Sequence, residues 1–282
     1  MVIEKDNDVV YHYCSVEAFL NIIQSSTLWL SDVLKSNDIK EETWIREKIN
    51  DKIEKLLAEI DLCALEAWNT WYKINNTLSG TIYASCFSQQ KDCLSQWRGY
   101  AQDGQGMAIG FSKEFLQLLN KPYFIKFEKV IYKERIQNKF INKIVNENIK
   151  KMTRTGVGHA AHELTSNYFL SFPLYKNPSF EDENEWRIIL LSHPDHQKNG
   201  VFSDFKFLAP KFRVNNGSII SYIEMDFSNI KRKFIKEIWI GPKSKITKKD
   251  IVYLLAAKGY YKDTPYNENG PILIEYSKSS YR

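Results

Sequence analysis

Short runs of β-branched and aromatic residues occur at both ends of the chain, and this placement constrains the fold more than any other feature. The runs lie at residues 9–13 and 27–31 near the start, and at 219–225, 237–240 and 272–276 near the end. Between them, apolar residues at helical spacing indicate one long helix, or two with a kink, over about residues 40–72. Strands at both ends with helices between them predict an α+β fold with a mixed or antiparallel sheet.

Further patterns complete this outline. Strands are expected at residues 80–88, 107–111, 123–132, 185–191 and 202–207, and helices at 113–119, 134–151 and 160–169. Ser15 and Thr247 are expected to cap two more helices, the second running to Lys258. Because no linker, repeat or low-complexity tract interrupts the chain, we expect one domain over residues 1–282, with helical insertions at about 38–76 and 134–170.

The composition excludes several classes of protein. No apolar run approaches the roughly 18 residues that a membrane span requires, and the opening MVIEKDND is acidic where a signal peptide would be basic. We therefore expect a cytoplasmic protein with no membrane partner. The four cysteines, Cys14, Cys63, Cys86 and Cys93, form no Cys-x-x-Cys pair, so reduced and mostly buried thiols are expected.

The net charge of +5 is unevenly distributed along the chain. Residues 1–70 hold 7 basic and 14 acidic side chains, residues 121–154 hold 10 and 3, and residues 231–262 hold 10 and 2. The two basic blocks are consistent with a surface that attracts nucleic acid. They are equally consistent with solvated helix faces balanced by the acidic N-terminal segment.

Common catalytic and nucleotide-binding motifs are absent. The sequence contains no G-x-G-x-x-G, no P-loop, no G-x-S-x-G and no H-E-x-x-H. Two H-x-x-H pairs, at residues 159–162 and 193–196, lack a neighbouring third ligand, so no metal site is expected.

Polar and aromatic residues gather instead in a few dense stretches. In the first predicted strand, His12 faces opposite to Tyr11 and Tyr13, so only one of these two sets can face a site. The alternative is a structural histidine with two core tyrosines. A later strand ends at Ser88 and leads to Trp97 and Tyr100, which are spaced for stacking on a ligand ring or for packing in the core.

The stretch FEDENEWRII crowds acids in front of a strand. In a strand that begins near residue 183, Glu183, Glu185 and Arg187 share one face and Trp186 lies on the other. A carboxylate and a guanidinium two residues apart can pair with each other, or one can orient the other for catalysis. The remaining possibility is a solvated face without function.

Taken in order, these stretches resemble the bacterial DUF2971 family, a domain of unknown function. The resemblance rests on YHYCSVEAFLNIIQSSTLWLS with SNDIKEE, then ASCFSQQKDCLSQWRGYAQDGQGMAIGF, FEDENEWRIIL, EIWIGP and a closing SYR. It extends over about residues 9–282. The family description itself implies no activity.

A looser resemblance does imply one. The opening Y-H-Y, the helix ending in two isoleucines and the returning strand resemble the first elements of ADP-ribosyltransferase folds, especially the DarT-like and RNA 2'-phosphotransferase-like branches. This resemblance implies that NAD is the co-substrate, that His12 bonds its ribose, and that Tyr13, Ser31 and Ser88 line the pocket. Glu185 or Glu183 would be the late carboxylate.

Cleavage of NAD, which this resemblance implies, suggests roles for Arg187, Trp97 and Tyr100. Cleavage of the nicotinamide–ribose bond develops positive charge on the ribose, which a nearby carboxylate stabilises. The resemblance implies that Arg187 holds Glu185 or a pyrophosphate oxygen, and that Trp97 or Tyr100 stacks on a ring of NAD.

Three functions follow as hypotheses. The first is an NAD-dependent ADP-ribosyltransferase-like enzyme or NAD hydrolase, acting in anti-phage defence or as a toxin, with a nucleic-acid or protein acceptor. The second is a non-catalytic module that senses a nucleotide or a phage protein through residues 97–110. The third is a nuclease that uses Asp182, Glu183 and Glu185 to bind Mg²⁺ or Mn²⁺. The sequence leaves the acceptor and the oligomeric state open.

Overall fold

The protein is described by a computed structural model. It describes residues 8–35, 81–120, 124–155, 171–192, 200–202, 204–215, 217–261 and 271–281, together with residues 44, 47–48, 51–52 and 55. The predicted helix over residues 40–72 and the insertion at 38–76 lie largely outside these residues. The predicted helix at 160–169, and the insertion beyond residue 155, lie entirely outside them.

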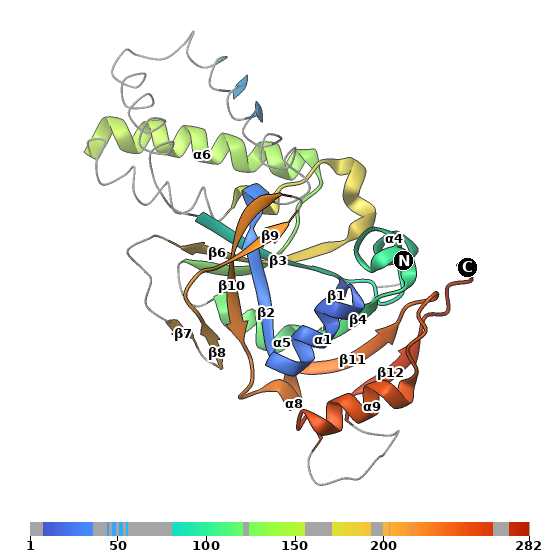
Figure 1. Cartoon of the computed structure of the whole chain (residues 1–282). Coiled ribbons are helices and arrows are strands. Elements are labelled where there is room, and N and C mark those ends of the chain that lie inside the picture. Colours follow the sequence, from blue (N-terminus) through green and yellow to red (C-terminus); the bar gives the residue numbers. More distant parts are fainter. Residues whose placement is uncertain are drawn as a thin grey trace.

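One mixed sheet joins strands from both ends of the chain (Figure 1). The order along the main path is β12-β11-β4-β1-β3-β2-β10-β8-β7, with β6 between β3 and β5, and β9 against β10. The strands are β1 Val9–Cys14, β2 Thr27–Asp32, β3 Thr81–Ser88, β4 Met107–Ser112, β5 Ile125–Lys129, β6 Glu185–Ser192, β7 Gly200–Phe202, β8 Phe205–Phe207, β9 Lys211–Asn215, β10 Ser218–Asp226, β11 Ile235–Ile240 and β12 Leu273–Tyr276. Every pair of these strands is antiparallel except β11 with β12.

Strand β3 has three partners. Strand β6 pairs with its whole length, from Thr81 opposite Ser192 to Ser88 opposite Glu185. The other edge of β3 is shared, because β1 pairs only at Ser88, whereas β2 pairs only at Tyr83 and Ala84. Residues 85–87 therefore have no strand partner on that edge among the described residues.

The apolar face of the sheet is covered by short helices. They are α1 Val16–Ser25, α5 Lys113–Gln117, α8 Lys231–Phe234 and α9 Lys248–Ala257. Alternate strand residues such as Val10, Phe87 and Ile188 point to this face and pack with Phe19 and Leu255 from the helices. Ser15 caps α1, and Thr247 caps α9 with a capping box, so both predicted caps are confirmed.

A smaller cluster lies on the opposite face. Tyr11, Tyr13 and Trp239 from the strands surround Trp97 of helix α4 Leu94–Tyr100. Helix α4 thus covers the end of the second face next to β1, and carries Tyr100 at its last position.

The predicted α+β class is confirmed, and most predicted strands are found near their expected bounds. The strand expected at 123–132 is shorter, and the one expected at 202–207 is two strands separated by residues 203–204. Strand β9 was not expected, although KFRVN alternates charged with apolar residues, as an exposed strand does. No helix among the described residues is long and apolar enough to cross a membrane.

The two basic blocks do not lie side by side. The first includes helix α6 Glu134–Thr155, and the second includes α8 and α9. Figure 1 shows α6 at one end of the molecule and α8 with α9 at the other. A single continuous basic surface formed by both blocks is therefore not supported.

Gly106 provides a test of the packing between the β4 entrance and β1. A Cβ at this position would overlap the carbonyl oxygen of Cys14 and the backbone of Ala101. We expect Gly106→Ala to lower the free energy of unfolding by about 2 kcal/mol or more, because backbone atoms cannot yield as side chains do. Urea unfolding measures this change.

The matched control is Gly99→Ala, because a Cβ at Gly99 of α4 meets nothing within 4 Å. Alanine favours a helix over glycine, so this variant should gain roughly 0.5 kcal/mol. Equal effects of the two substitutions would contradict the packing described here.

Candidate active site

The acidic stretch before β6 ends in a buried ion pair. Glu185 and Arg187 point to the same face of β6, and the guanidinium Nε and NH2 donate to the two carboxylate oxygens at 2.8 Å each. Both side chains are buried. The remaining terminal nitrogen, NH1, donates to the Pro173 carbonyl at 2.7 Å. Two parallel bonds of this kind hold both groups in fixed orientation.

Glu183 lies outside the strand. It ends the 3-10 helix η5 Pro178–Glu183, and Asn184 follows in the left-handed region with φ of 45°. The prediction that Glu183 shares a strand face with Glu185 is therefore wrong, because the backbone turns between them. A lysine joins the two acids instead: Lys176 Nζ lies 2.6 Å from Glu183 Oε2 and 3.6 Å from Glu185 Oε2.

Burial and charge act against each other on Glu185. Burial raises the pKa of its carboxyl, but the charge and hydrogen bond of Arg187, the charge of Lys176 and a hydrogen bond from Cys86 lower it more. The net pKa lies below the ordinary value of 4.5. Glu185 is therefore ionised at neutral pH, even though it is buried.

His12 occupies the position where β1 and β2 separate along β3. Its Nδ1 lies 2.9 Å from the carbonyl oxygen of Cys86, in the part of β3 that neither strand pairs on that edge. A carbonyl only accepts, so Nδ1 carries the proton in this bond. Burial lowers the pKa of His12, and the bond to Cys86 opposes this effect only in part. The imidazole is therefore neutral, with Nε2 as an acceptor.

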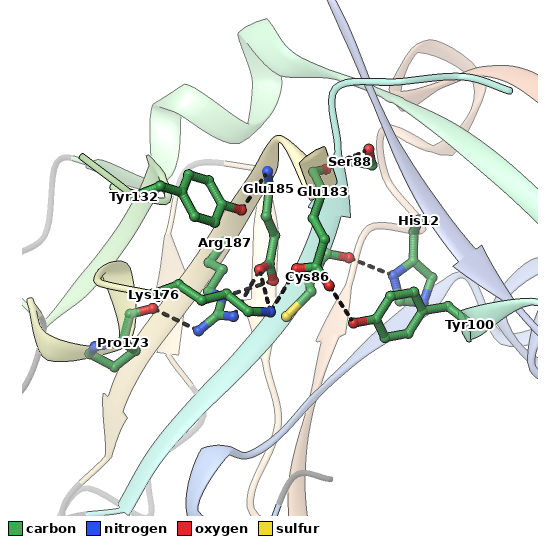
Figure 2. Close-up of polar contacts among 10 residues, drawn as sticks. All are labelled: His12, Cys86, Ser88, Tyr100, Tyr132, Pro173, Lys176, Glu183, Glu185 and Arg187. Atoms are coloured by element: carbon green, nitrogen blue, oxygen red, sulfur yellow. Dashed lines mark hydrogen bonds and ion pairs between the residues drawn. The ribbon is translucent and has the colours of Figure 1, made fainter. Parts of the chain in front are cut away.

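By strand alternation, His12 belongs to the opposite face from Tyr11 and Tyr13, as predicted. The acids lie on the face of Tyr11, because Tyr11 pairs with Ser88 and Ser88 with Glu185. His12 is connected to them through Cys86, whose carbonyl accepts from His12 and whose thiol side chain interacts with Glu185. Figure 2 shows Cys86 between the histidine and the acids.

Tyr100 completes the cluster from the side of α4. Its hydroxyl donates to Glu183 Oε1 at 3.2 Å, while 52% of its surface is exposed. Figure 2 thus shows Tyr100 bonded to Glu183, Lys176 between Glu183 and Glu185, and His12 bonded to the Cys86 carbonyl. The side chain of Cys86 in turn interacts with Glu185.

The other aromatic candidates lie in packed surroundings. Trp97 is fully buried and its Nε1 donates to Asp92 at 2.7 Å. Tyr13 packs edge-on against it at 4.8 Å between ring centroids and donates to the Gln90 carbonyl. Of the Trp97 and Tyr100 pair, Tyr100 is thus the ring that a ligand can reach.

The two predicted serines lie apart. Ser88 donates to the Glu183 carbonyl at 3.0 Å and accepts from the Gln90 amide, so it fixes the backbone beside the cluster. Ser31 lies on β2 opposite Ala84, away from the acids, and accepts from Arg213 at 3.3 Å. The ligand-binding roles of both serines stay predictions.

Several residues of the cluster were not found from the sequence. Lys176 is buried, and its backbone carbonyl accepts from the amide of Gln137, which is fully buried in α6. The same amide donates to the carbonyl of Tyr132, whose hydroxyl accepts from the Glu185 amide at 3.2 Å. Nothing in PLYKN or ERIQN distinguishes these side chains from surface residues. Cys86, expected among mostly buried thiols, is exposed.

Metal binding finds no support in this cluster. Among the described residues, no three His, Cys, Asp or Glu side chains lie close enough to hold an ion. Asp182, Glu183 and Glu185 are all described, so they do not form the ligand set that a nuclease would need. The two H-x-x-H pairs lie outside the described residues.

The comparisons agree with the family resemblance. Residues 96–188 of the 282-residue chain match the family model described as "Protein of unknown function (DUF2971)", which confirms the predicted family over this segment. The matched segment includes Tyr100, Lys176, Glu183 and Glu185. Neither the curated proteins nor the solved structures contain a significant match.

The ion pair of Glu185 generates a stability prediction. We expect Glu185→Gln to lower the free energy of unfolding by about 3 kcal/mol at pH 7, because it leaves the buried charge of Arg187 unpaired. Since the pKa of Glu185 is lowered in the folded state, its contribution is present above pH 4.5 and is lost as the pH falls through the folded pKa. The difference between the two proteins should therefore shrink below about pH 4.5 in urea unfolding.

The control is Glu224→Gln, which removes the carboxylate of another lysine pair. Glu224 lies 2.8 Å from Lys211, whose side chain is 50% exposed. This pair should be worth no more than about 1 kcal/mol. If Glu185→Gln lowered the free energy of unfolding no more than Glu224→Gln does, the buried pair would not stabilise the protein more than an exposed pair.

Proposed function

We propose that the protein is an NAD-dependent enzyme of the ADP-ribosyltransferase type, which transfers ADP-ribose to a macromolecule or hydrolyses NAD. The observation that carries the proposal is the chain of contacts from His12 to Glu183 and Tyr100. A carboxylate can stabilise the cationic ribose that forms when the nicotinamide–ribose bond breaks, a neutral imidazole can accept a hydrogen bond from a ribose hydroxyl, and an exposed aromatic ring can stack on NAD. The shared edge of β3 supports an architecture of this type, because among the described strands β1 and β2 pair at its two ends and His12 bonds the Cys86 carbonyl between them.

Of the two acids, we assign Glu183 to the reaction. Both oxygens of Glu185 are engaged by Arg187, and only 8% of its side chain is exposed. Glu183 is 17% exposed and contacts the accessible Tyr100. Glu185 then serves as a positioning residue, since it holds Lys176 and Arg187 in place beside Glu183.

The reaction breaks the bond between the ribose C1' and the nicotinamide nitrogen, and the electron pair leaves with nicotinamide. The ribose becomes oxocarbenium-like, and the negative charge of Glu183 stabilises it. Water or an acceptor group then forms a bond to C1', and its proton passes to a carboxylate or to solvent.

His12 contributes as an acceptor. Because Nδ1 donates to the Cys86 carbonyl, the lone pair of Nε2 is available to a ribose hydroxyl. Protonation would convert this acceptor into a donor. The lowered pKa of His12 keeps the acceptor form present at neutral pH.

The biological setting and acceptor are proposed from the sequence resemblance. It implies a cytoplasmic enzyme that acts in bacterial anti-phage defence or as a toxin, with a nucleic-acid or protein acceptor. The separate positions of the two basic blocks favour neither acceptor.

A non-catalytic sensing module is the second candidate. It is favoured by the two ion pairs, which engage both carboxylates. In that function Tyr100 would contact the ligand and the charge of Glu183 would not be needed for turnover.

The decisive experiment measures nicotinamide release from NAD by chromatography, with and without RNA, DNA or cell lysate. We expect Glu183→Gln to reduce release at least about 100-fold, because the charge that stabilises the cationic state is removed. We expect His12→Ala to reduce it about 10-fold or more.

The matched control is Glu275→Gln, which removes a carboxylate bound to Lys248 on the distant strand β12. This variant should retain full activity. Absence of nicotinamide release under every condition, together with no NAD binding by calorimetry, would remove the enzymatic proposal. Binding of NAD that survives Glu183→Gln without any turnover would favour the sensing module.

A further inference from the structure

Arg213 on β9 is a half-buried cation that pairs with no carboxylate among the described residues. None of the ion pairs formed by described residues includes it. Its Nε is buried and has no hydrogen-bond partner. Its terminal NH2 donates to Ser31 Oγ at a long 3.3 Å. A guanidinium withdrawn from water in this way is costly unless an anion or further acceptors satisfy it.

The nearest acids on neighbouring strands do not supply that anion. Asp32 of β2 alternates to the opposite face from Ser31. Glu224 of β10 shares the face of Arg213 but bonds Lys211 at 2.8 Å.

Aromatic packing holds the guanidinium in position. It lies over the ring of Trp29, 5.6 Å from the centroid, and the ring of Tyr222 lies 4.3 Å from that of Trp29. Tyr222 and Ser31 are directly paired across β10 and β2, which run side by side. A guanidinium packed on an aromatic ring loses little entropy when it binds an anion through its planar fork.

The position of Ser31 and Arg213 in the sheet indicates which kind of ligand would carry that anion. Ser31 pairs with Ala84, and Cys86 of the candidate site lies two residues further along β3 on the same face. At about 3.3 Å per residue, the two places are roughly 7 Å apart along the strand. One extended ligand of nucleotide size can therefore reach both.

We propose that Arg213 and Ser31 form a subsite for a phosphoryl group, and that its natural occupant is the pyrophosphate of a nucleotide that extends toward Cys86. The Arg213 fork donates to two phosphate oxygens, and the Ser31 hydroxyl adds a third donor. The assignment of this anion to a nucleotide rests on the proposed function, whereas the binding of pyrophosphate by Arg213 and Ser31 is tested separately from the reaction.

Calorimetric titration of the full chain with inorganic pyrophosphate at low ionic strength tests the subsite. We expect Arg213→Gln to weaken binding about 10-fold or more, because both the charge and the fork are lost. Arg213→Lys keeps the charge without the fork and should give an intermediate loss. Ser31→Ala should weaken binding about three-fold, and it serves as the second variant if Arg213→Gln does not fold.

The matched control is Arg135→Gln, an equal charge change at an exposed position of the basic helix α6. It should alter pyrophosphate affinity by no more than about two-fold, as screened surface charge does. Equal weakening by Arg135→Gln and Arg213→Gln, or no binding of pyrophosphate to the unaltered protein, would overturn the subsite. Tighter binding of acetate than of pyrophosphate would overturn its assignment to phosphate.

A parallel titration with NAD separates the two proposals. Arg213-dependent binding of pyrophosphate without any release of nicotinamide from NAD would leave the subsite standing and remove the proposed reaction. Nicotinamide release that is unchanged by Arg213→Gln, with unchanged pyrophosphate affinity, would leave the reaction standing and remove the subsite.

Discussion

The structure depends on the way three strands share β3. Strand β6 takes one full edge, while β1 and β2 divide the other and leave residues 85–87 without a strand partner there. His12 lies at this gap and its Nδ1 donates to the Cys86 carbonyl, which adds a side-chain bond to the pairing of Tyr11 with Ser88. Segments more than seventy positions apart in the sequence therefore meet here. The candidate site is therefore a consequence of sheet topology.

Charge burial imposes the second constraint. Two carboxylates, a lysine and an arginine lie together beside the sheet, and each is paired. Such a group is held more by the cost of separating its members than by any large net gain. Two further hydrogen bonds hold the cations in place. The Gln137 side-chain amide donates to the Lys176 carbonyl, and Arg187 donates to the Pro173 carbonyl. The two acids differ in their surroundings: Glu183 is partly exposed and bonds Lys176 and Tyr100, whereas Glu185 is buried and both of its oxygens bond Arg187.

Much of the fold could be read from the residues. The β-branched and aromatic runs located most strands, and Ser15 and Thr247 marked two helix starts, because both signals act over a few neighbouring residues. Residue alternation correctly placed Glu185 and Arg187 on one face and His12 opposite Tyr13. The prediction for Glu183 was wrong, because Asn184 adopts a left-handed conformation and the strand begins only after it. A single asparagine is not enough to predict such a turn. Strand β9 was missed although the sequence signals it: its charged and apolar residues alternate, and Asn216-Gly217 between β9 and β10 is a dipeptide typical of a hairpin turn.

Local sequence patterns alone predicted the α+β class and the family resemblance, and they placed Glu185 and Arg187 on one strand face, where an ion pair was one of the possibilities. These follow from local periodicity and from side chains that share a face. Only the tertiary structure decided that Lys176 joins the acids, that Cys86 connects them to His12, and that Arg213 meets Ser31 and Trp29. Each of those contacts joins segments far apart in the chain, and their geometry arises from sheet order and burial, which no local pattern encodes.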